Sequence, residues 1–213
     1  MVTSRSADRA GSLRRFDGLE RALHWANAVL FVVVLTSAAA LYFGPLSAVV
    51  GRRELVRAIH VYSGLALPLP FVAAFVLGRR WHSQLGDDVR RLNRWIDDDR
   101  RWLRSLGRDR RVRLGKFHPG QKINAAYLAG GVPVMVLTGS IMKWFEPFPL
   151  SWRTGATFVH DWVALGFFVL VTGHVLKAVA DRDAMHGILT GWVDEGWATA
   201  RHPRWRAEHR KPV

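Results

Sequence analysis

Four long apolar stretches constrain the fold of this chain more than any other feature of its sequence. The first, Trp25–Phe43, runs for 19 residues without a charged side chain, and at about 1.5 Å per residue this length crosses a hydrocarbon core of about 30 Å. We predict helices over about 24–43, 58–77, 123–142 and 157–179. The expected fold is all-α: an integral membrane four-helix bundle that forms one domain over residues 1–213. Buried helices of a soluble bundle are the alternative, but those should show a polar stripe.

Cysteine is absent from all 213 residues, which removes several kinds of chemistry. Disulfides, thiolate-held iron–sulfur clusters, thiol nucleophiles and the covalent attachment of c-type haem all require it. The formal net charge of +14 would ordinarily suggest nucleic-acid binding. Four membrane spans argue against that class, so we expect no nucleic-acid partner.

The basic residues are unevenly distributed between the loops. The segment before His24, the loop 79–122 and the segment from Lys177 onward hold 26 of the 31 Lys and Arg residues, and the other two loops hold five. The positive-inside rule therefore places both termini and the central loop in the cytoplasm. The first stretch begins some two dozen residues into the chain without a small-residue cleavage pattern, so no cleaved signal peptide is expected.

The central loop shows a helical apolar stripe from Leu85 to Leu106, with arginines elsewhere on the wheel. This pattern predicts a basic amphipathic helix on the inner membrane surface, held by membrane lipid. A docking surface for a cytoplasmic subunit is the alternative. The N-terminal dozen residues and the segment after Arg201 are expected to be poorly ordered.

Four of the nine histidines lie within or at the ends of the apolar spans: His24, His60, His160 and His174. Ionisable residues inside a bilayer are candidates for function. His160 and His174 are 14 residues apart, which separates them by about 21 Å on nearly the same helix face. The alternating direction of the helices puts His60 level with His160 and His24 level with His174. The histidines of loops and tail, His82, His186, His202 and His209, are expected to be solvated.

Two facing imidazoles in an apolar bundle are what a six-coordinate b-type haem requires. Small residues provide room, since Gly64 and Ala28 lie one turn after His60 and His24, and Gly173 adjoins His174. Hydrogen-bonded core histidines are one alternative, and zinc or copper sites are another. The metal alternative lacks Cys, Met or carboxylate partners at matching spacing.

Several segments resemble the cytochrome b (gamma) subunit of membrane-bound formate dehydrogenases, within the diheme group that includes hydrogenase cytochrome b subunits. The matching pieces cover about residues 16–205 and comprise Arg21–Trp25, Arg57–His60, Lys116–Lys122 and the pair His160 and His174. The resemblance implies two haem b groups, one held by His60 and His160 at the outer face and one by His24 and His174 at the inner face. It also implies menaquinone or ubiquinone as substrate, with a quinone site near His118, Gly120 and Gln121.

The resemblance further implies partners and a location. An iron–sulfur (beta) subunit and a molybdenum or tungsten catalytic (alpha) subunit would supply electrons, in the inner (plasma) membrane of a bacterium. The chain itself shows no dehydrogenase active site, so we expect an electron-transfer subunit of an oxidoreductase. A hydrogenase, a thiosulfate reductase or another quinone-linked complex is the alternative partner. A haem-free transporter or membrane anchor is the alternative class.

Three charged residues near the spans need separate interpretation. Lys122 and Arg153 are expected to be membrane-interface anchors, with pairing to haem propionates as the alternative. Asp161 follows His160 directly and could hydrogen-bond a ligand imidazole. Adjacent helical residues point about 100° apart, which disfavours that contact.

Overall fold

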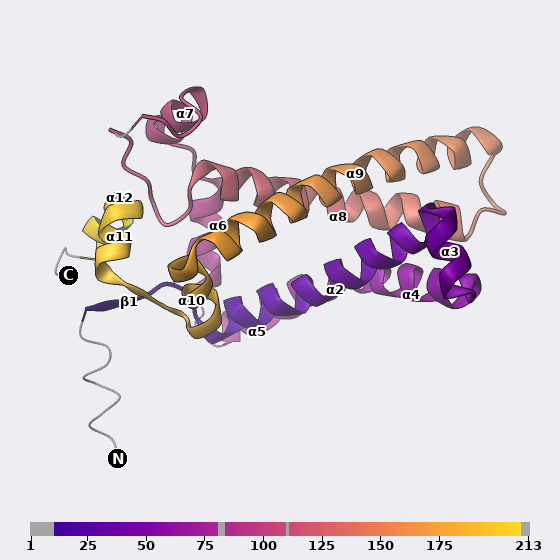
Figure 1. Ribbon diagram of the computed structural model, residues 1–213, viewed down its shortest axis with the longest axis horizontal. Coiled ribbons are helices and arrows are strands. Elements are labelled where there is room, and N and C mark those ends of the chain that lie inside the picture. The colour runs from indigo at the N-terminus through magenta and orange to yellow at the C-terminus, as the bar shows by residue number, and fades with distance from the viewer. Residues whose placement is uncertain (1–10, 81–83, 110, 210–213) are drawn as a thin grey trace, which may run out of the picture. The chain divides into compact units, whose positions relative to one another are not determined.

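The computed structural model describes residues 11–80, 84–109 and 111–209, which are helical along most of their length (Figure 1). Four stretches of helix are long and apolar enough to cross a membrane: Gly18–Tyr42, Arg53–Leu77, Pro119–Lys143 and Leu150–Ala180. The prediction of an all-α membrane helical bundle is confirmed. The chain divides into two compact units, which we call the bundle unit (Ala22–Arg79 and Tyr127–His174) and the loop unit (Met1–Arg21, Arg80–Ala126 and Val175–Val213).

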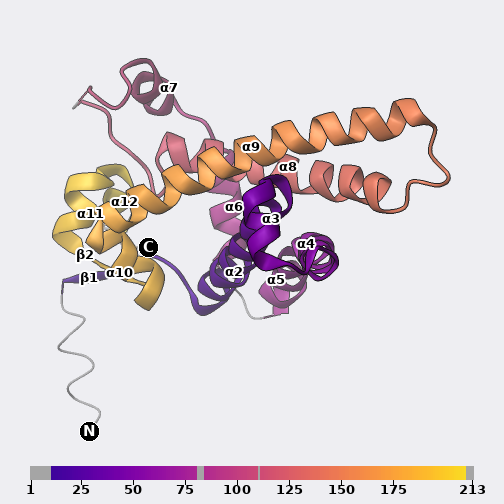
Figure 2. The same ribbon diagram turned by 45° about the vertical axis from the view of Figure 1, so that its right-hand side comes forward.

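The first, third and fourth spans are the uninterrupted helices α2 (Gly18–Tyr42), α8 (Pro119–Lys143) and α9 (Leu150–Ala180). They begin four to seven residues before the predicted starts, because polar residues at their ends continue the helical hydrogen bonding beyond the apolar stretch. Helices α8 and α9 lie side by side in both views (Figures 1 and 2). A short helix α3 (Gly44–Val50) follows α2.

The second span differs from the single predicted helix. It consists of α4 (Arg53–Ala66) and α5 (Leu69–Arg80), separated at Leu67 and Pro68. Proline has no backbone N–H and its ring crowds the preceding turn, which explains the interruption. The N–H of Leu67 bonds instead to the carbonyl of Gly64 at 3.2 Å.

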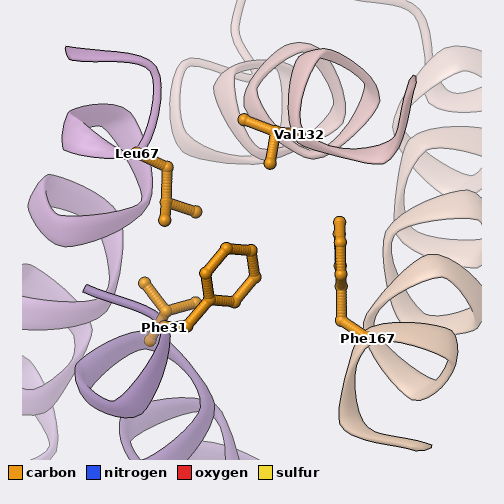
Figure 3. Packing of buried hydrophobic residues seen from close by; sticks show 5 residues of the cluster. Phe31, Leu67, Val132 and Phe167 are labelled. Carbon is orange, nitrogen blue, oxygen red and sulfur yellow. The ribbon is translucent and has the colours of Figure 1, made fainter. Parts of the chain in front are cut away.

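An apolar cluster fills the middle of the bundle unit. It is formed by the side chains of Phe31, Val34, Leu67, Val132 and Phe167. Figure 3 shows Phe31, Leu67, Val132 and Phe167 pointing toward one another. Leu67 comes from the break between α4 and α5, and the other three come from three different helices. The Phe31 and Phe167 ring centres are 5.3 Å apart, and Tyr127 contacts Phe167 edge-on at 5.1 Å. Gly131 permits this packing, since a Cβ there would come within 2.6 Å of Phe167.

The central loop contains two short helices where the sequence predicts one. Helix α6 spans Leu85–Asn93 and α7 spans Asp97–Arg104. The carboxylate of Asp99 accepts the N–H of Ile96 at 3.0 Å and starts the second helix. Acidic residues at 97–99 also favour a helix N-terminus over a helix interior. The apolar stripe is thereby divided, and Val89, Trp95 and Leu106 remain exposed.

The end of the chain is more ordered than the sequence suggests. Helices α10 (Arg182–Thr190), α11 (Glu195–Arg201) and α12 (Pro203–Glu208) follow α9, and strand β2 (Trp192–Asp194) pairs antiparallel with β1 (Ser12–Arg14). Trp205 is buried against Val193 and Ala198. The expectation of disorder after Arg201 is therefore wrong through residue 208, because this tryptophan anchors the segment. Residues 1–10, within the predicted disordered N-terminus, lie outside the described residues.

Candidate functional site

His60 and His160 form one of two histidine pairs in the bundle unit. His60 lies on α4 and His160 on α9, and their ring centres are 6.3 Å apart with an angle of 69° between the ring planes. Both side chains are partly buried. The structure thus brings together the two histidines that the helix directions predict at one level.

His24 and His174 form the second pair. His24 lies on α2 and His174 on α9, and their ring centres are 6.2 Å apart with an interplanar angle of 52°. The indole of Trp25 contacts the His24 ring edge-on at 5.2 Å. Within the described residues, the buried Nδ1 of His24 has no hydrogen-bond partner. The 14-residue spacing of His160 and His174 separates the two pairs by about 21 Å along α9.

The spacing within each pair can be compared with that of two imidazoles on one metal ion. A metal–nitrogen bond is about 2 Å long. A five-membered ring with bonds of about 1.35 Å has its centre about 1.15 Å from each atom. Two ring centres on opposite sides of one ion therefore lie about 6.3 Å apart. The observed 6.2 Å and 6.3 Å match this value, so the two histidines of each pair would fit a haem whose iron they hold together.

The surroundings of the pairs leave room beside the imidazoles. A Cβ added at Gly64 or at Gly173 would meet no atom within 4 Å. At Gly139 a Cβ would come 3.3 Å from Cε1 of His160, so this glycine allows α8 to approach the ring. Among the described residues, no group of three or more His, Asp or Glu side chains could hold a metal ion by itself. The donor set suits a macrocycle that brings its own equatorial ligands.

Hydrogen bonds made by Nδ1 orient the rings of His60 and His160. The Nδ1 of His160 lies 3.0 Å from Oγ1 of Thr138, and that of His60 lies 3.2 Å from both Oγ of Ser37 and the carbonyl oxygen of Val34. Ser37 and Thr138 are not among the residues that the sequence indicates as partners of these rings. Asp161, the candidate for this contact by its position next to His160, is exposed. Ser37 and Thr138 are both hydroxyl residues on a helix next to that of the histidine. Their role can be predicted only when it is known which helices lie side by side.

The predicted quinone residues His118, Gly120 and Gln121 form the turn that starts α8, within the loop unit. The N–H of Gly120 donates to Nδ1 of His118 at 3.0 Å, and the N–H of His118 donates to Oε1 of Gln121 at 3.0 Å. A Cβ at Gly120 would come 2.8 Å from the His118 ring, which accounts for glycine there. The ring of Trp102 lies 5.6 Å from that of His118. In a neutral His118, these bonds place the ring proton on Nε2.

Two buried ion pairs join the central loop to the start of α8. The ammonium of Lys122 lies 2.6 Å from Oδ2 of Asp99 and also donates to the carbonyl of Arg94 at 2.7 Å. The ammonium of Lys116 pairs with the carboxylate of Asp88. All four charged side chains are almost completely buried. The interpretation of Lys122 as a membrane-interface anchor is wrong, because its charge is satisfied inside the protein.

His202 is also buried, in contrast to the solvated histidine that the sequence suggests. Its Nδ1 donates to the carbonyl of Gly115 at 2.6 Å, and its ring lies 4.9 Å from that of Trp197. Burial, with the nearby positive charge of Arg15 as a second cause, lowers the pKa of His202 to about 3. His186 and His209 are exposed as expected, and His82 lies outside the described residues.

Comparison with known proteins relates the chain to membrane cytochromes. The sequence profile of a family described as prokaryotic cytochrome b561 matches residues 15–191. The formate dehydrogenase cytochrome b556(fdo) subunit of Escherichia coli (strain K12) is 26% identical over 214 residues, covering 95% of this chain and 96% of the relative. The formate dehydrogenase cytochrome b556 subunit of Haemophilus influenzae is 26% identical over 200 residues, covering 88% and 79%. The nitrate-inducible cytochrome b556(Fdn) subunit from E. coli K12 is 24% identical over 205 residues, covering 91% and 89%.

Proposed function

The chain belongs to the prokaryotic cytochrome b561 family, and from that premise we propose that it is the membrane cytochrome b subunit of a formate dehydrogenase complex. In this role it carries electrons from an iron–sulfur partner through two haem b groups to menaquinone or ubiquinone near the cytoplasmic face. The observation that carries the proposal is the presence of two histidine pairs, 6.2 Å and 6.3 Å between ring centres, in one membrane bundle. The names of the three relatives support formate dehydrogenase as the complex.

The histidines divide into two ligand sets. His60 and His160 hold the outer haem, and His24 and His174 hold the inner haem. When bound, each haem supplies a centre that accepts and gives up one electron. One histidine of each pair lies on helix α9, and the apolar cluster around Phe167 excludes water from the space between the two sites.

The quinone site is assigned to the turn at His118, Gly120 and Gln121. The Nε2–H of a neutral His118 can donate a hydrogen bond to a quinone carbonyl or pass a proton to the reduced oxygen. Gly120 holds the ring in this tautomer through its N–H. The indole of Trp102 lies beside the ring, with the ring centres 5.6 Å apart.

The charge distribution supports the orientation in the membrane. With 26 of 31 basic residues in the termini and the loop 79–122, these segments lie on the cytoplasmic side of a bacterial inner membrane. The partner subunits of the complex are an iron–sulfur (beta) protein and a molybdenum or tungsten catalytic (alpha) protein. The beta subunit delivers electrons at the outer face, next to His60 and His160.

Haem counting in purified single variants tests the ligand sets. We expect two haems per chain in the wild type and one in each of His24→Ala, His60→Ala, His160→Ala and His174→Ala, measured by pyridine haemochrome and reduced-minus-oxidised spectra. The haem that remains shows that the bundle is folded. His186→Ala, at an exposed histidine outside the pairs, is the matched control and should keep both haems. Two haems in all four variants would refute the ligand assignment.

Electron delivery tests the choice of complex. In membranes that contain the co-expressed partner subunits, formate should reduce the outer haem in the wild type and in His24→Ala or His174→Ala. In His60→Ala and His160→Ala, which lack the outer haem, formate should reduce no haem. Reduction by hydrogen or by reduced sulfur compounds, without reduction by formate, would instead assign the chain to a hydrogenase, thiosulfate reductase or other quinone-linked complex. The name of the family does not specify a dehydrogenase, so the electron donor has to be measured.

A further inference from the structure

Two hydroxyl side chains contact the histidines of one pair in the same way. Ser37 on α2 lies 3.2 Å from Nδ1 of His60, and Thr138 on α8 lies 3.0 Å from Nδ1 of His160. Each hydroxyl residue is 7% exposed, so water does not compete freely for these contacts. The two contacts come from different helices and reach the two members of one pair.

The hydroxyl proton of each residue is already engaged by its own helix. Oγ of Ser37 donates to the carbonyl of Val33 at 2.6 Å, and Oγ1 of Thr138 donates to the carbonyl of Val134 at 2.8 Å. A hydroxyl has one proton to donate and lone pairs with which to accept. It must therefore accept from the imidazole. The ring proton of each histidine is thereby held on Nδ1, and the lone pair is held on Nε2.

We propose that Ser37 and Thr138 are positioning residues that fix His60 and His160 as Nδ1–H tautomers and raise the basicity of their Nε2 atoms toward a haem iron. The inference rests on the proposed function. Metal-bound histidines commonly donate the second ring N–H to an acceptor of this kind, which strengthens the ligand. A stronger ligand favours the more highly charged ferric iron and lowers the reduction potential of the haem that it holds.

The other histidine pair lacks this arrangement. The buried Nδ1 of His24 has no partner among the described residues, and His174 is exposed. The difference predicts a lower reduction potential for the haem at His60 and His160 than for the haem at His24 and His174. Electrons that enter at the first site then move to the second in the favourable direction.

Removal of each hydroxyl tests the inference by redox titration. Thr138→Val keeps the side-chain shape and removes the acceptor, so the midpoint potential of the His60–His160 haem should rise. We expect up to a tenfold shift toward the reduced form, which corresponds to about 59 mV for one electron. Ser37→Ala should give a smaller rise, because the carbonyl of Val34 at 3.2 Å remains available to His60. Thr138→Ser retains the hydroxyl and should behave as the wild type.

Thr36→Val is the matched control. Thr36 also donates to the carbonyl four residues earlier, that of Val32 at 2.6 Å, but its side chain is exposed, and its hydrogen bonds within the described residues go to backbone carbonyls. Its replacement should leave both midpoint potentials unchanged. The component that belongs to the His60–His160 haem is identified by its disappearance in His160→Ala.

The outcomes separate this inference from the proposed function. A shift confined to one haem, restored in Thr138→Ser, supports the inference, as does loss of that haem in Thr138→Val with retention in Thr138→Ser. Two haems with unmoved potentials in Thr138→Val would overturn it while leaving the proposed function intact. An equal shift in Thr36→Val, or loss of the haem in both Thr138 variants, would also overturn it. Absence of haem from the wild type would refute the proposed function itself.

Discussion

The buried pair of Lys122 and Asp99 gives a prediction whose size follows from its geometry. The side chains are 7% and 1% exposed, and the charged atoms are 2.6 Å apart. At an effective dielectric constant of about 20 such charges attract by about 6 kcal/mol, and the loss of hydration offsets much of this. Replacing Lys122 by Met leaves the Asp99 carboxylate buried without its partner, which should cost about 3–5 kcal/mol. For a chain of this size the thermal midpoint should fall by about 10 °C.

The double variant isolates the charge pair from the packing. Lys122→Met with Asp99→Asn removes both charges and keeps a side-chain oxygen that can accept the N–H of Ile96, so most of the lost stability should return. Arg100→Met is the control, because Arg100 pairs with Asp97 at 3.7 Å on an exposed surface, and such pairs contribute about 0–1 kcal/mol. Thermal unfolding of detergent-solubilised protein, followed by circular dichroism, measures all three. An unchanged midpoint in Lys122→Met, or no recovery in the double variant, would refute the reasoning.

Two further predictions concern a buried histidine and the apolar cluster. Burial lowers the pKa of His202 to about 3, so below pH 6.5 the unfolded chain binds a proton that the native chain does not, and stability should fall by about 1.4 kcal/mol per pH unit. In His202→Asn the thermal midpoints at pH 7 and pH 5 should converge, and an unaltered pH dependence would contradict this. Phe167→Ala should cost about 3–5 kcal/mol in the same unfolding assay, whereas a loss below 1 kcal/mol would show that the cluster is loosely packed.

The membrane spans and the histidine pairs could be predicted from the sequence because both depend on one-dimensional regularities. An uncharged run of 19 residues has few alternatives to a membrane helix. The 14-residue spacing of His160 and His174 fixes their level and face through the rise of a helix. The structure brings His24 and His60 to the partners that these regularities indicate. The role of the four residues as haem ligands remains a prediction.

The loop unit could not be predicted in this way, because its order depends on contacts between distant segments. Lys122 directly precedes an apolar stretch, as a membrane-interface anchor does. Only the position of Asp99 shows that its charge is neutralised inside the protein. His202 lies in a basic tail, and its burial depends on the carbonyl of Gly115, 87 residues earlier. The separation of α6 from α7 depends on the Asp99 carboxylate. The local sequence pattern around a residue does not indicate a partner that lies far away along the chain.

Phe167 lies seven residues from His160 and seven from His174, so its cluster occupies the level midway between the two histidine pairs. Protons move through a membrane along chains of water or hydrogen-bonding side chains, and the five clustered side chains offer none. The cluster itself therefore provides no hydrogen-bonded path for a proton, and the hydroxyl of Tyr127, which packs against it, donates to the carbonyl of Val163. Under the proposed function, an electron that passes from one pair to the other crosses this cluster without a proton beside it. Each such electron then moves charge across the membrane, and the membrane potential that results depends on the packing of these apolar side chains.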